Sequence, residues 1–273
     1  AVAPNGTVYI SCWMYISSVD TNGIFHLRVA GKAALGFAGD GGPATNAQFS
    51  FITAIAVGAD GSLYICDYNN KRVRRVTPNG IVNTVAGNGS LGFSGDGGAA
   101  TNAAIGSPTG LAVARDGTMY IISDNSHRIR RVSPAGIINT LAGNGSSGFS
   151  GDGGPATSAV LSFPTACKMG PDGALYVADF GNSRVRRIGT DGIITTVAGN
   201  GIVDEYSGDG GPAIDAGVDH PDDLTVDSEG TLYIHENQNL HIRAVTADGI
   251  IRTVAGTGYT GAPFTDNAPA TSV

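Results

Sequence analysis

The chain alternates short apolar segments with glycine-containing turns. Between residues 54 and 85, apolar segments are separated by the turn pairs Asp60-Gly61 and Asn79-Gly80. Two-residue signals of this kind join antiparallel strands. The pattern therefore predicts four strands, at residues 54–57, 63–65, 72–76 and 81–85.

This four-strand pattern occurs five times. Each copy closes on a tripeptide that ends in Ala-Gly, and successive copies are 56, 56, 56 and 57 residues apart. The alanines are Ala30, Ala86, Ala142, Ala198 and Ala255. A fixed period of this size indicates a repeat architecture. Four antiparallel strands without a covering helix bury both faces only when copies stack around an axis. We therefore expect an all-β fold, a β-propeller of four-stranded antiparallel blades, with five repeats of about 56 residues.

The two ends of the chain fit one closed ring. Ala1-Val2 matches Ala56-Val57 inside a first strand, with a few residues of that strand missing, and the tail at 268–271 matches the crossover segment at 154–157. We expect residues 1–273 to form a single propeller domain, with the ring closed by pairing of the two chain ends. Six blades stay open as an alternative to five.

The two faces of such a ring differ in loop length. Tight turns gather on one face, while the loops between second and third strands and the long crossovers between blades lie on the other. The crossover after Gly87 contains Gly-Phe-Ser-Gly-Asp-Gly-Gly at 92–98, which recurs at 148–154, and Pro43 and Pro155 are expected to begin one helical turn. Long loops carry function, so partners are expected on the long-loop face.

Composition narrows the classes of partner. The chain has a formal charge of −7 and only three lysines. An acidic chain without a basic stripe is a poor nucleic-acid binder, and no apolar run reaches a transmembrane length. Cys12, Cys66 and Cys167 occupy non-equivalent repeat positions, which argues against a disulfide framework and a cysteine metal site. We expect no nucleic-acid partner and no membrane insertion.

The repeats resemble those of NHL-repeat β-propellers. The residues that carry the resemblance are 171–179 and 181–188, with the same pattern at 60–76 and 116–132. The crossover is similar to that in the NHL domain of teneurins and in bacterial surface or secreted proteins with long NHL arrays. The resemblance implies a propeller, usually of six blades. Members are mostly protein-interaction modules, while some similar propellers bind RNA or act as lyases and lactonases.

Three sets of charged residues repeat, and repetition favours a structural role. The crossover aspartates are expected to form Asx turns, with a ring of Ca²⁺ ligands as the alternative. The aspartates after the second strands are expected to organise the following loop by accepting hydrogen bonds across it. The donors would be backbone groups or the first arginine of the third strand. For the arginine-rich third strands, pairing with these carboxylates is favoured over an anion or RNA surface. The sets are Asp40, Asp96, Asp152 and Asp209; Asp67 and Asp179, with Ser123, Glu236 and Cys12 at the equivalent positions; and Arg72, Arg74, Arg75, Arg128, Arg130, Arg131, Arg184, Arg186 and Arg187.

The last repeat departs from the others because it is strongly acidic. Residues 204–248 hold eleven Asp or Glu and one basic residue. His220 and the pair Asp222-Asp223 replace the usual residues at the start of the innermost strand, at the mouth of the central channel. If Asp222, Asp223 and Glu236 converge, their carboxylates would suit a hard cation such as Ca²⁺, and His220 would then be the general base. In similar metal-dependent propeller lactonases, acids near this mouth hold the cation. A solvated acidic surface is the alternative.

The first repeat departs in another way. Cys12-Trp13-Met14-Tyr15 replaces the polar loop found in other repeats. Trp and Tyr are good binding anchors, so we expect a binding face on the long-loop side, with local repacking as the alternative. Its members are Trp13, Tyr15, Tyr68 and Phe180.

Two functions fit these observations. The favoured one is a non-enzymatic recognition propeller, a protein-interaction or adhesion module of a secreted or cell-surface protein, with a protein or glycan partner on the long-loop face. The alternative is a cation-dependent hydrolase or lyase, lactonase-like, whose site at the channel mouth uses His220, Asp222 and Asp223 with Ca²⁺.

Overall fold

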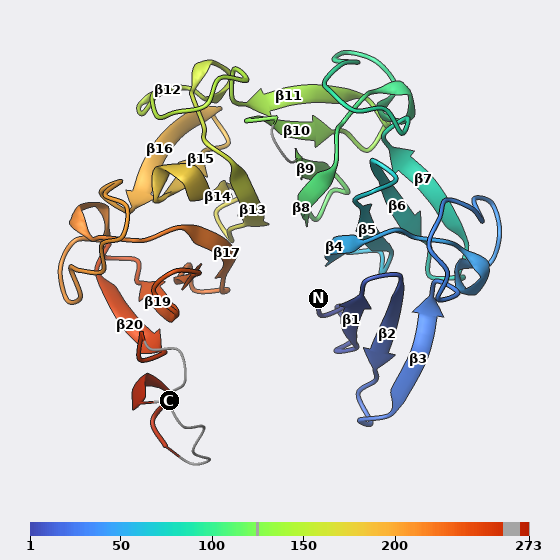
Figure 1. The fold of residues 1–273 in the computed structure, drawn as a ribbon, viewed down its shortest axis with the longest axis horizontal. Coiled ribbons are helices and arrows are strands. Elements are labelled where there is room, and N and C mark those ends of the chain that lie inside the picture. Colours follow the sequence, from blue (N-terminus) through green and yellow to red (C-terminus); the bar gives the residue numbers. More distant parts are fainter. Residues whose placement is uncertain (124–125, 259–267, 273) are drawn as a thin grey trace. The chain divides into compact units, whose positions relative to one another are not determined.

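The computed structural model describes residues 1–123, 126–258 and 268–272 of an all-β chain (Figure 1). It contains two compact units, Ala1–Thr140 and Leu141–Val273. The described residues form five antiparallel sheets, each built from one sequence repeat. The fold is therefore a β-propeller of five blades, as the repeats predict. The single domain with paired chain ends stays a prediction.

The blades are antiparallel meanders in chain order. Blade 1 contains β1 (Val8–Cys12), β2 (Tyr15–Val19) and β3 (Phe25–Ala30); blade 2 contains β4 (Ile52–Val57), β5 (Leu63–Asp67), β6 (Arg72–Val76) and β7 (Val82–Ala86). Blade 3 contains β8 (Pro108–Val113), β9 (Met119–Ser123), β10 (Ile129–Val132) and β11 (Ile138–Ala142). Blade 4 contains β13 (Pro164–Met169), β14 (Leu175–Asp179), β15 (Arg184–Ile188) and β16 (Ile193–Ala198), and blade 5 contains β17 (Pro221–Val226), β18 (Leu232–Glu236), β19 (His241–Val245) and β20 (Ile251–Ala255).

Two blades depart from the expected four strands. Blade 1 has three strands, and an isolated bridge between Val2 and Val8 stands where its innermost strand was expected. The sheet of blade 4 has a fifth strand, β12 (Gly154–Pro155), because this crossover segment pairs with β16. The innermost strands also begin earlier than predicted, since β4 starts at Ile52, before a β-bulge that ends at Ile55.

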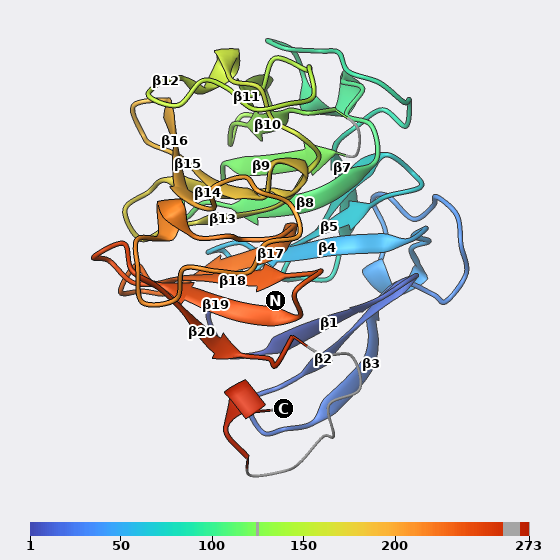
Figure 2. The ribbon, with the colours of Figure 1, turned by 60° about the vertical axis from the view of Figure 1, so that its left-hand side comes forward.

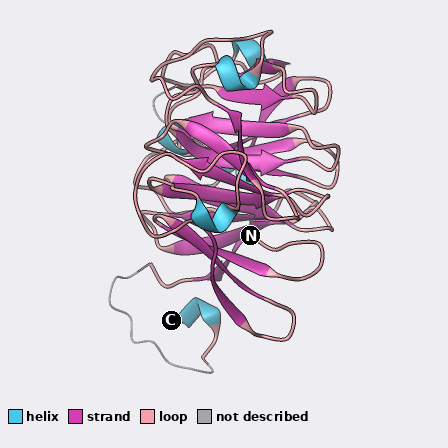
Figure 3. Ribbon diagram, turned by 90° about the vertical axis from the view of Figure 1, so that its right-hand side faces the viewer, coloured by secondary structure: helices cyan, strands magenta, loops and turns pink. Residues whose placement is uncertain are grey.

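The crossovers contain short 3₁₀ helices, drawn in cyan in Figure 3. They include the helical turns expected after Pro43 and Pro155. The helix after Pro43 docks by backbone hydrogen bonds: the Gly31 N–H donates to the Ala44 carbonyl at 2.8 Å, and the Ala44 N–H donates to the Gly80 carbonyl at 2.7 Å. A crossover therefore ties the outer strand of one blade to the next blade. The short helices that follow an outer strand are η1 (Ala44–Asn46), η2 (Ala100–Asn102), η3 (Ala156–Ser158), η5 (Ala213–Asp215) and η6 (Ala270–Ser272), whereas η4 (Phe180–Asn182) lies in the loop between β14 and β15.

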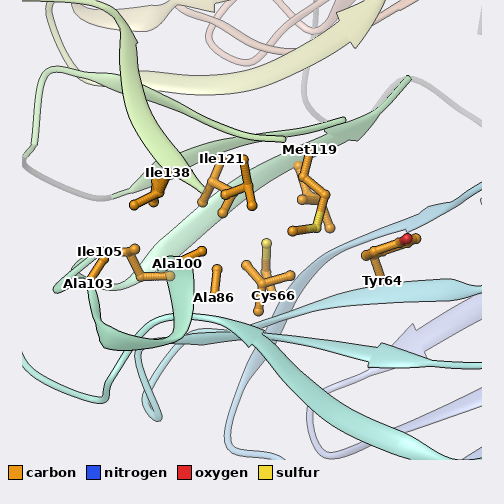
Figure 4. Packing of buried hydrophobic residues seen from close by; sticks show 12 residues of the cluster. Tyr64, Cys66, Ala86, Ala100, Ala103, Ile105, Met119, Ile121 and Ile138 are labelled. Atoms are coloured by element: carbon orange, nitrogen blue, oxygen red, sulfur yellow. The ribbon is translucent and has the colours of Figure 1, made fainter. Parts of the chain in front are cut away.

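The core lies between the faces of neighbouring blades. In unit 1, Cys66 of β5 and Ala86 of β7 pack with Met119 and Ile121 of β9, and Ile105 closes the cluster (Figure 4). In unit 2, a matching cluster joins blades 4 and 5, whose innermost strands β13 and β17 are in contact (Figure 2). Burying both faces of each sheet in this way is what the helix-free repeat requires. No helix in the described part of the chain is long and apolar enough to cross a membrane.

Candidate functional site

A buried arginine lies at the middle of the third strand in blades 2 to 5. Each of these four central arginines is at most 2% exposed. Each pairs with the aspartate of the preceding crossover at 2.6–2.7 Å, because a buried guanidinium needs a carboxylate partner. The pairs are Arg74–Asp40, Arg130–Asp96, Arg186–Asp152 and Arg243–Asp209. The expected pairing of arginines with repeat carboxylates is confirmed, whereas the Asx-turn role of the crossover aspartates is wrong.

The carboxylate after the second strand is also buried beside the central arginine. Asp67 accepts hydrogen bonds from the Ser50 N–H and the Asn70 amide, both at 2.8 Å, and lies 3.5 Å from Arg74. The expectation that Arg72 is the arginine donor is wrong, because Arg72 donates to backbone carbonyls and covers the Phe37 ring at 4.0 Å. Burial raises the pKa of Asp67. In blade 2, Asp40, Asp67 and Arg74 thus hold the crossover and the loop to the blade.

Glu236 occupies the same place in blade 5. It is fully buried, lies 3.4 Å from Arg243, and accepts from the Asn239 amide at 2.9 Å. Burial raises the pKa of Glu236. The equivalent residues of blades 2 and 4, Asp67 and Asp179, contact their central arginines in the same way, so Glu236 belongs to the structural set.

Asp222 and Asp223 lie at the β-bulge where β17 begins. Asp222 accepts from the His235 ring and from the Asn237 amide, the latter at 2.7 Å, and Asp223 accepts from the Leu224 N–H at 2.9 Å. Among the described residues, no three His, Cys, Asp or Glu side chains converge as a metal site. The structure therefore does not bring the expected cation ligands together.

His220 is bonded to a carboxylate that the sequence analysis missed. Its Nδ1 contacts Asp219, which is 1% exposed, and its ring packs on Phe180 at a centroid distance of 4.7 Å. An imidazole held by a carboxylate can act as a general base. In the part of the chain that the structure describes, no hydroxyl or thiol is bonded to this ring, so the geometry supplies a base without a nucleophile.

Three aromatic residues gather on the long-loop side of unit 1. Trp13 is 72% exposed and meets Phe51 edge-on at 5.8 Å, and Phe51 meets Tyr68 edge-on at 5.7 Å. Backbone hydrogen bonds hold them: the Ile52 N–H donates to the Trp13 carbonyl at 2.9 Å, and the Tyr68 N–H donates to the Phe51 carbonyl at 3.1 Å. We call Trp13, Phe51 and Tyr68 the aromatic trio. Such an exposed cluster is typical of an interaction surface.

The structure thus unites two of the four expected aromatic residues. Tyr15 instead packs against Arg28 at 5.6 Å, and Phe180 belongs to unit 2, on His220. Phe51 was missed, although a signal exists. It occupies the repeat position just before the innermost strand, as Phe163 and His220 do, and all three have a left-handed backbone with φ of 63°, 45° and 45°.

Repeated four-stranded blades joined by long crossovers, with a buried arginine pair in each of blades 2 to 5, define a repeat β-propeller. The family profile described as "Teneurin NHL domain" matches residues 89–148. Teneurin-m of Drosophila melanogaster is 31% identical over 73% of this chain, and Teneurin-4 of Mus musculus is 29% identical over 76%. These matches support the resemblance of the chain to NHL-repeat propellers. It spans about 8% of the length of these curated relatives.

Solved structures share the fold at lower identity. A virginiamycin B lyase from Staphylococcus aureus has a TM-score of 0.56 and 17% identity, with 93% of this chain and 67% of that chain covered. A gluconolactonase from Xanthomonas campestris has a TM-score of 0.60 and 17% identity over 91% and 71%. An auxiliary nutrient binding protein from Bacteroides ovatus has a TM-score of 0.63 and 14% identity over 94% and 56%. Enzymes and binding proteins therefore share this fold, and function must be argued from the residues.

Proposed function

We propose that this chain is a non-enzymatic recognition propeller, a protein-interaction or adhesion module of a larger secreted or cell-surface protein. The observation that carries the proposal is the aromatic trio. Trp13 is mostly exposed, yet Phe51 and Tyr68 hold it at one place on the loop face. A rigid aromatic anchor loses little side-chain entropy on binding. The similarity to teneurin NHL domains supports the same class of function.

The partner is proposed to be a protein that offers an apolar or aromatic surface, with a glycan as the alternative that the experiment separates. The charged side chains inside the blades are unlike a partner surface. The central arginines and their carboxylates are committed to each other inside the blades, so they are not offered to a partner. The loop face then contributes aromatic groups and exposed polar rims, which is the usual anatomy of a protein interface.

The test uses the immobilised chain and two variants. Trp13→Ala removes the anchor, and Leu91→Ala is the matched control, because Leu91 is a 73% exposed apolar residue of the crossover after blade 2. Each is exposed to the extracellular protein fraction of its source cells and to a glycan array. The wild type and Leu91→Ala should retain the same amount of ligand, and Trp13→Ala should retain about one tenth of that amount or less. Equal retention by all three would overturn the proposal, and retention of glycans alone would replace the protein partner.

A second candidate is the cation-dependent hydrolase or lyase, and its support is the adjacent pair Asp222-Asp223 beside the Asp219–His220 contact. Ca²⁺ would have to bind this pair without Glu236, which Arg243 already holds. Calorimetric titration of the metal-stripped chain with Ca²⁺ tests it, with Asp222→Asn/Asp223→Asn alongside. Heat that disappears in the double variant supports the site and justifies assays on lactones. No heat in either protein removes this candidate.

A further inference from the structure

The dipeptide Asn-Gly occurs six times in the chain, in two structural settings. Three copies lie in tight turns next to strands, and three begin the crossovers that follow blades 2, 3 and 4. The first set is Asn5, Asn22 and Asn79, and the second set is Asn88, Asn144 and Asn200. An asparagine followed by glycine is the pair most prone to cyclise, because the glycine nitrogen attacks the side-chain carbonyl with little hindrance. The setting of each pair decides whether this attack can occur.

The glycine N–H is used differently in the two settings. In the tight turns, Gly6, Gly23 and Gly80 each donate to the carbonyl three residues earlier, at 2.8–2.9 Å. In the part of the chain that the structure describes, the N–H groups of Gly89 and Gly201 donate to no acceptor. The backbone nitrogen that would attack is therefore held in the tight turns and available in these two crossovers.

The asparagine side chain is folded back over the same peptide. Oδ1 of Asn88 accepts from the Ser90 N–H, and Oδ1 of Asn200 accepts from the Ile202 N–H, both at 2.9 Å. This Asx turn places the side-chain carbonyl beside the peptide of the following glycine. The N–H donor also polarises that carbonyl and would stabilise the negative charge that an attack on Cγ puts on Oδ1.

An arginine side chain lies against each of these two peptides. Nη2 of Arg72 donates to the Asn88 backbone carbonyl at 2.8 Å, and Nη2 of Arg184 donates to that of Asn200 at 2.6 Å. Stacking on Phe37 at 4.0 Å fixes the Arg72 guanidinium. A fixed positive charge on the peptide oxygen stabilises the anion that forms when the peptide nitrogen loses its proton.

Only glycine fits beside these guanidinium groups. A Cβ placed on Gly89 would overlap Arg72, and one placed on Gly201 would overlap Arg184. The packing that holds the arginine against the peptide therefore requires the residue without a side chain. That residue is also the least hindered nucleophile that can follow an asparagine.

We propose that Asn88 and Asn200 deamidate in the folded chain through a succinimide, which makes both crossovers self-modifying. The glycine nitrogen loses its proton and bonds to Cγ of the asparagine. The Cγ–Nδ2 bond breaks, and the side-chain nitrogen takes up a proton and leaves as ammonia. Water then adds to one of the two imide carbonyl carbons and opens the ring, which gives aspartate or isoaspartate.

The conversion turns a hydrogen-bond donor into a charged acceptor that faces other acceptors. Nδ2 of Asn88 donates to the Asn102 carbonyl at 3.0 Å. Nδ2 of Asn200 donates to the Glu205 carboxylate at 3.2 Å and to the Asp215 carbonyl at 3.4 Å. A carboxylate at either position loses these bonds and repels the oxygens that accepted them. Deamidation is therefore expected to loosen the two crossovers as the protein ages.

Ageing of the purified chain at neutral pH tests the proposal, with mass spectrometry of its peptides and isoaspartate detection. In the folded wild type, the two crossover sites Asn88 and Asn200 should convert at least about tenfold faster than the tight-turn sites Asn5, Asn22 and Asn79. In urea, which removes the turns and the arginine contacts, the five sites should convert at rates within about threefold of one another. Crossover sites that convert no faster than the tight turns, or not at all, would overturn the proposal. The same preference in urea would assign it to local sequence and overturn it as well.

Arg72→Met tests the arginine at one site and leaves the other site as its control. Methionine keeps an apolar contact with Phe37 but donates no hydrogen bond. Conversion of Asn88 should slow by about tenfold, while Asn200, beside its own arginine, should keep its wild-type rate. Conversion of Asn88 at an unchanged rate would contradict the proposal. The comparison of the folded wild type with the chain in urea needs no variant, so it decides the matter even where Arg72→Met does not fold.

Discussion

At the scale of single residues, one arginine in each of four blades explains most of the repeated charge. Arg186 is fully buried and reaches both Asp152 and Asp179, whereas its neighbour Arg187 is 35% exposed and pairs at the surface with Asp172. Alternate residues of a strand point to opposite faces, so adjacent arginines have opposite roles. The sequence predicted the pairing but not which arginine is central, because burial at a blade interface is not visible in a repeated Arg-x-Arg-Arg pattern.

This difference gives the first prediction. Arg186→Met leaves two carboxylates without their cation, one of them fully buried, and should lower the free energy of unfolding by about 3–5 kcal/mol. Arg187→Met breaks a screened surface pair and should cost about 0–1 kcal/mol. Urea unfolding of both variants checks the values, and similar costs for the two would contradict the assignment.

The second prediction concerns pH. Burial raises the pKa of Asp179 to about 6, and this effect outweighs its donors Asn182, Ser162 and Arg186. An acid whose pKa is higher in the folded than in the unfolded state favours folding while it is protonated. Its contribution is therefore full below about pH 4 and is lost as the pH rises through about 6.

The stability of the wild type relative to Asp179→Asn should thus fall by roughly 1–3 kcal/mol as the pH rises across this range. Urea unfolding of both proteins at several pH values measures the difference. A relative stability that rises with pH would show that the three donors, not burial, control this carboxyl group.

At the scale of elements, the Ala-Gly step at the end of each repeat has a packing reason. Gly199 has φ of 92°, and a side chain there would overlap the Ser183 carbonyl oxygen, so only glycine lets the crossover leave β16 this close to the preceding loop. The sequence therefore predicted turns and strand order well, since both rest on local residue chemistry. It did not predict β12, because this strand depends on a pairing partner far along the chain.

The third prediction compares two glycines of blade 4. Gly192 also has a left-handed backbone, with φ of 79°, but no atom lies within 4 Å of a Cβ placed there. Gly192→Ala should cost about 1–2 kcal/mol from backbone strain alone. Gly199→Ala adds a backbone overlap and should cost clearly more. Thermal unfolding ranks the two variants, and an equal or smaller loss at Gly199 would refute the close-approach argument.

At the scale of the whole chain, Glu236 of the acidic last repeat is held inside its blade, whereas Trp13 of the aromatic first repeat is exposed. The sequence offered Glu236 both at the position of the loop-organising aspartates and as a cation ligand, and the fold buries it on Arg243. Trp13 stands out because aromatic residues replace polar ones in a repeated loop, whereas the contacts of Phe51 with Trp13 and Tyr68 depend on two loops that meet in three dimensions. Departures from a repeat thus locate candidate sites, while only packing decides which residues are committed to structure.

The central claim is that Trp13 is the anchor for a partner, and its own fluorescence tests this most directly. Trp13 is the one tryptophan of the chain, so its emission reports on this site alone. Titrating the ligand retained by the wild type should change the emission saturably and protect Trp13 from acrylamide, because a side chain that is now 72% exposed would become covered. Saturable binding with unchanged emission and unchanged quenching would contradict the account and place the interaction elsewhere on the chain.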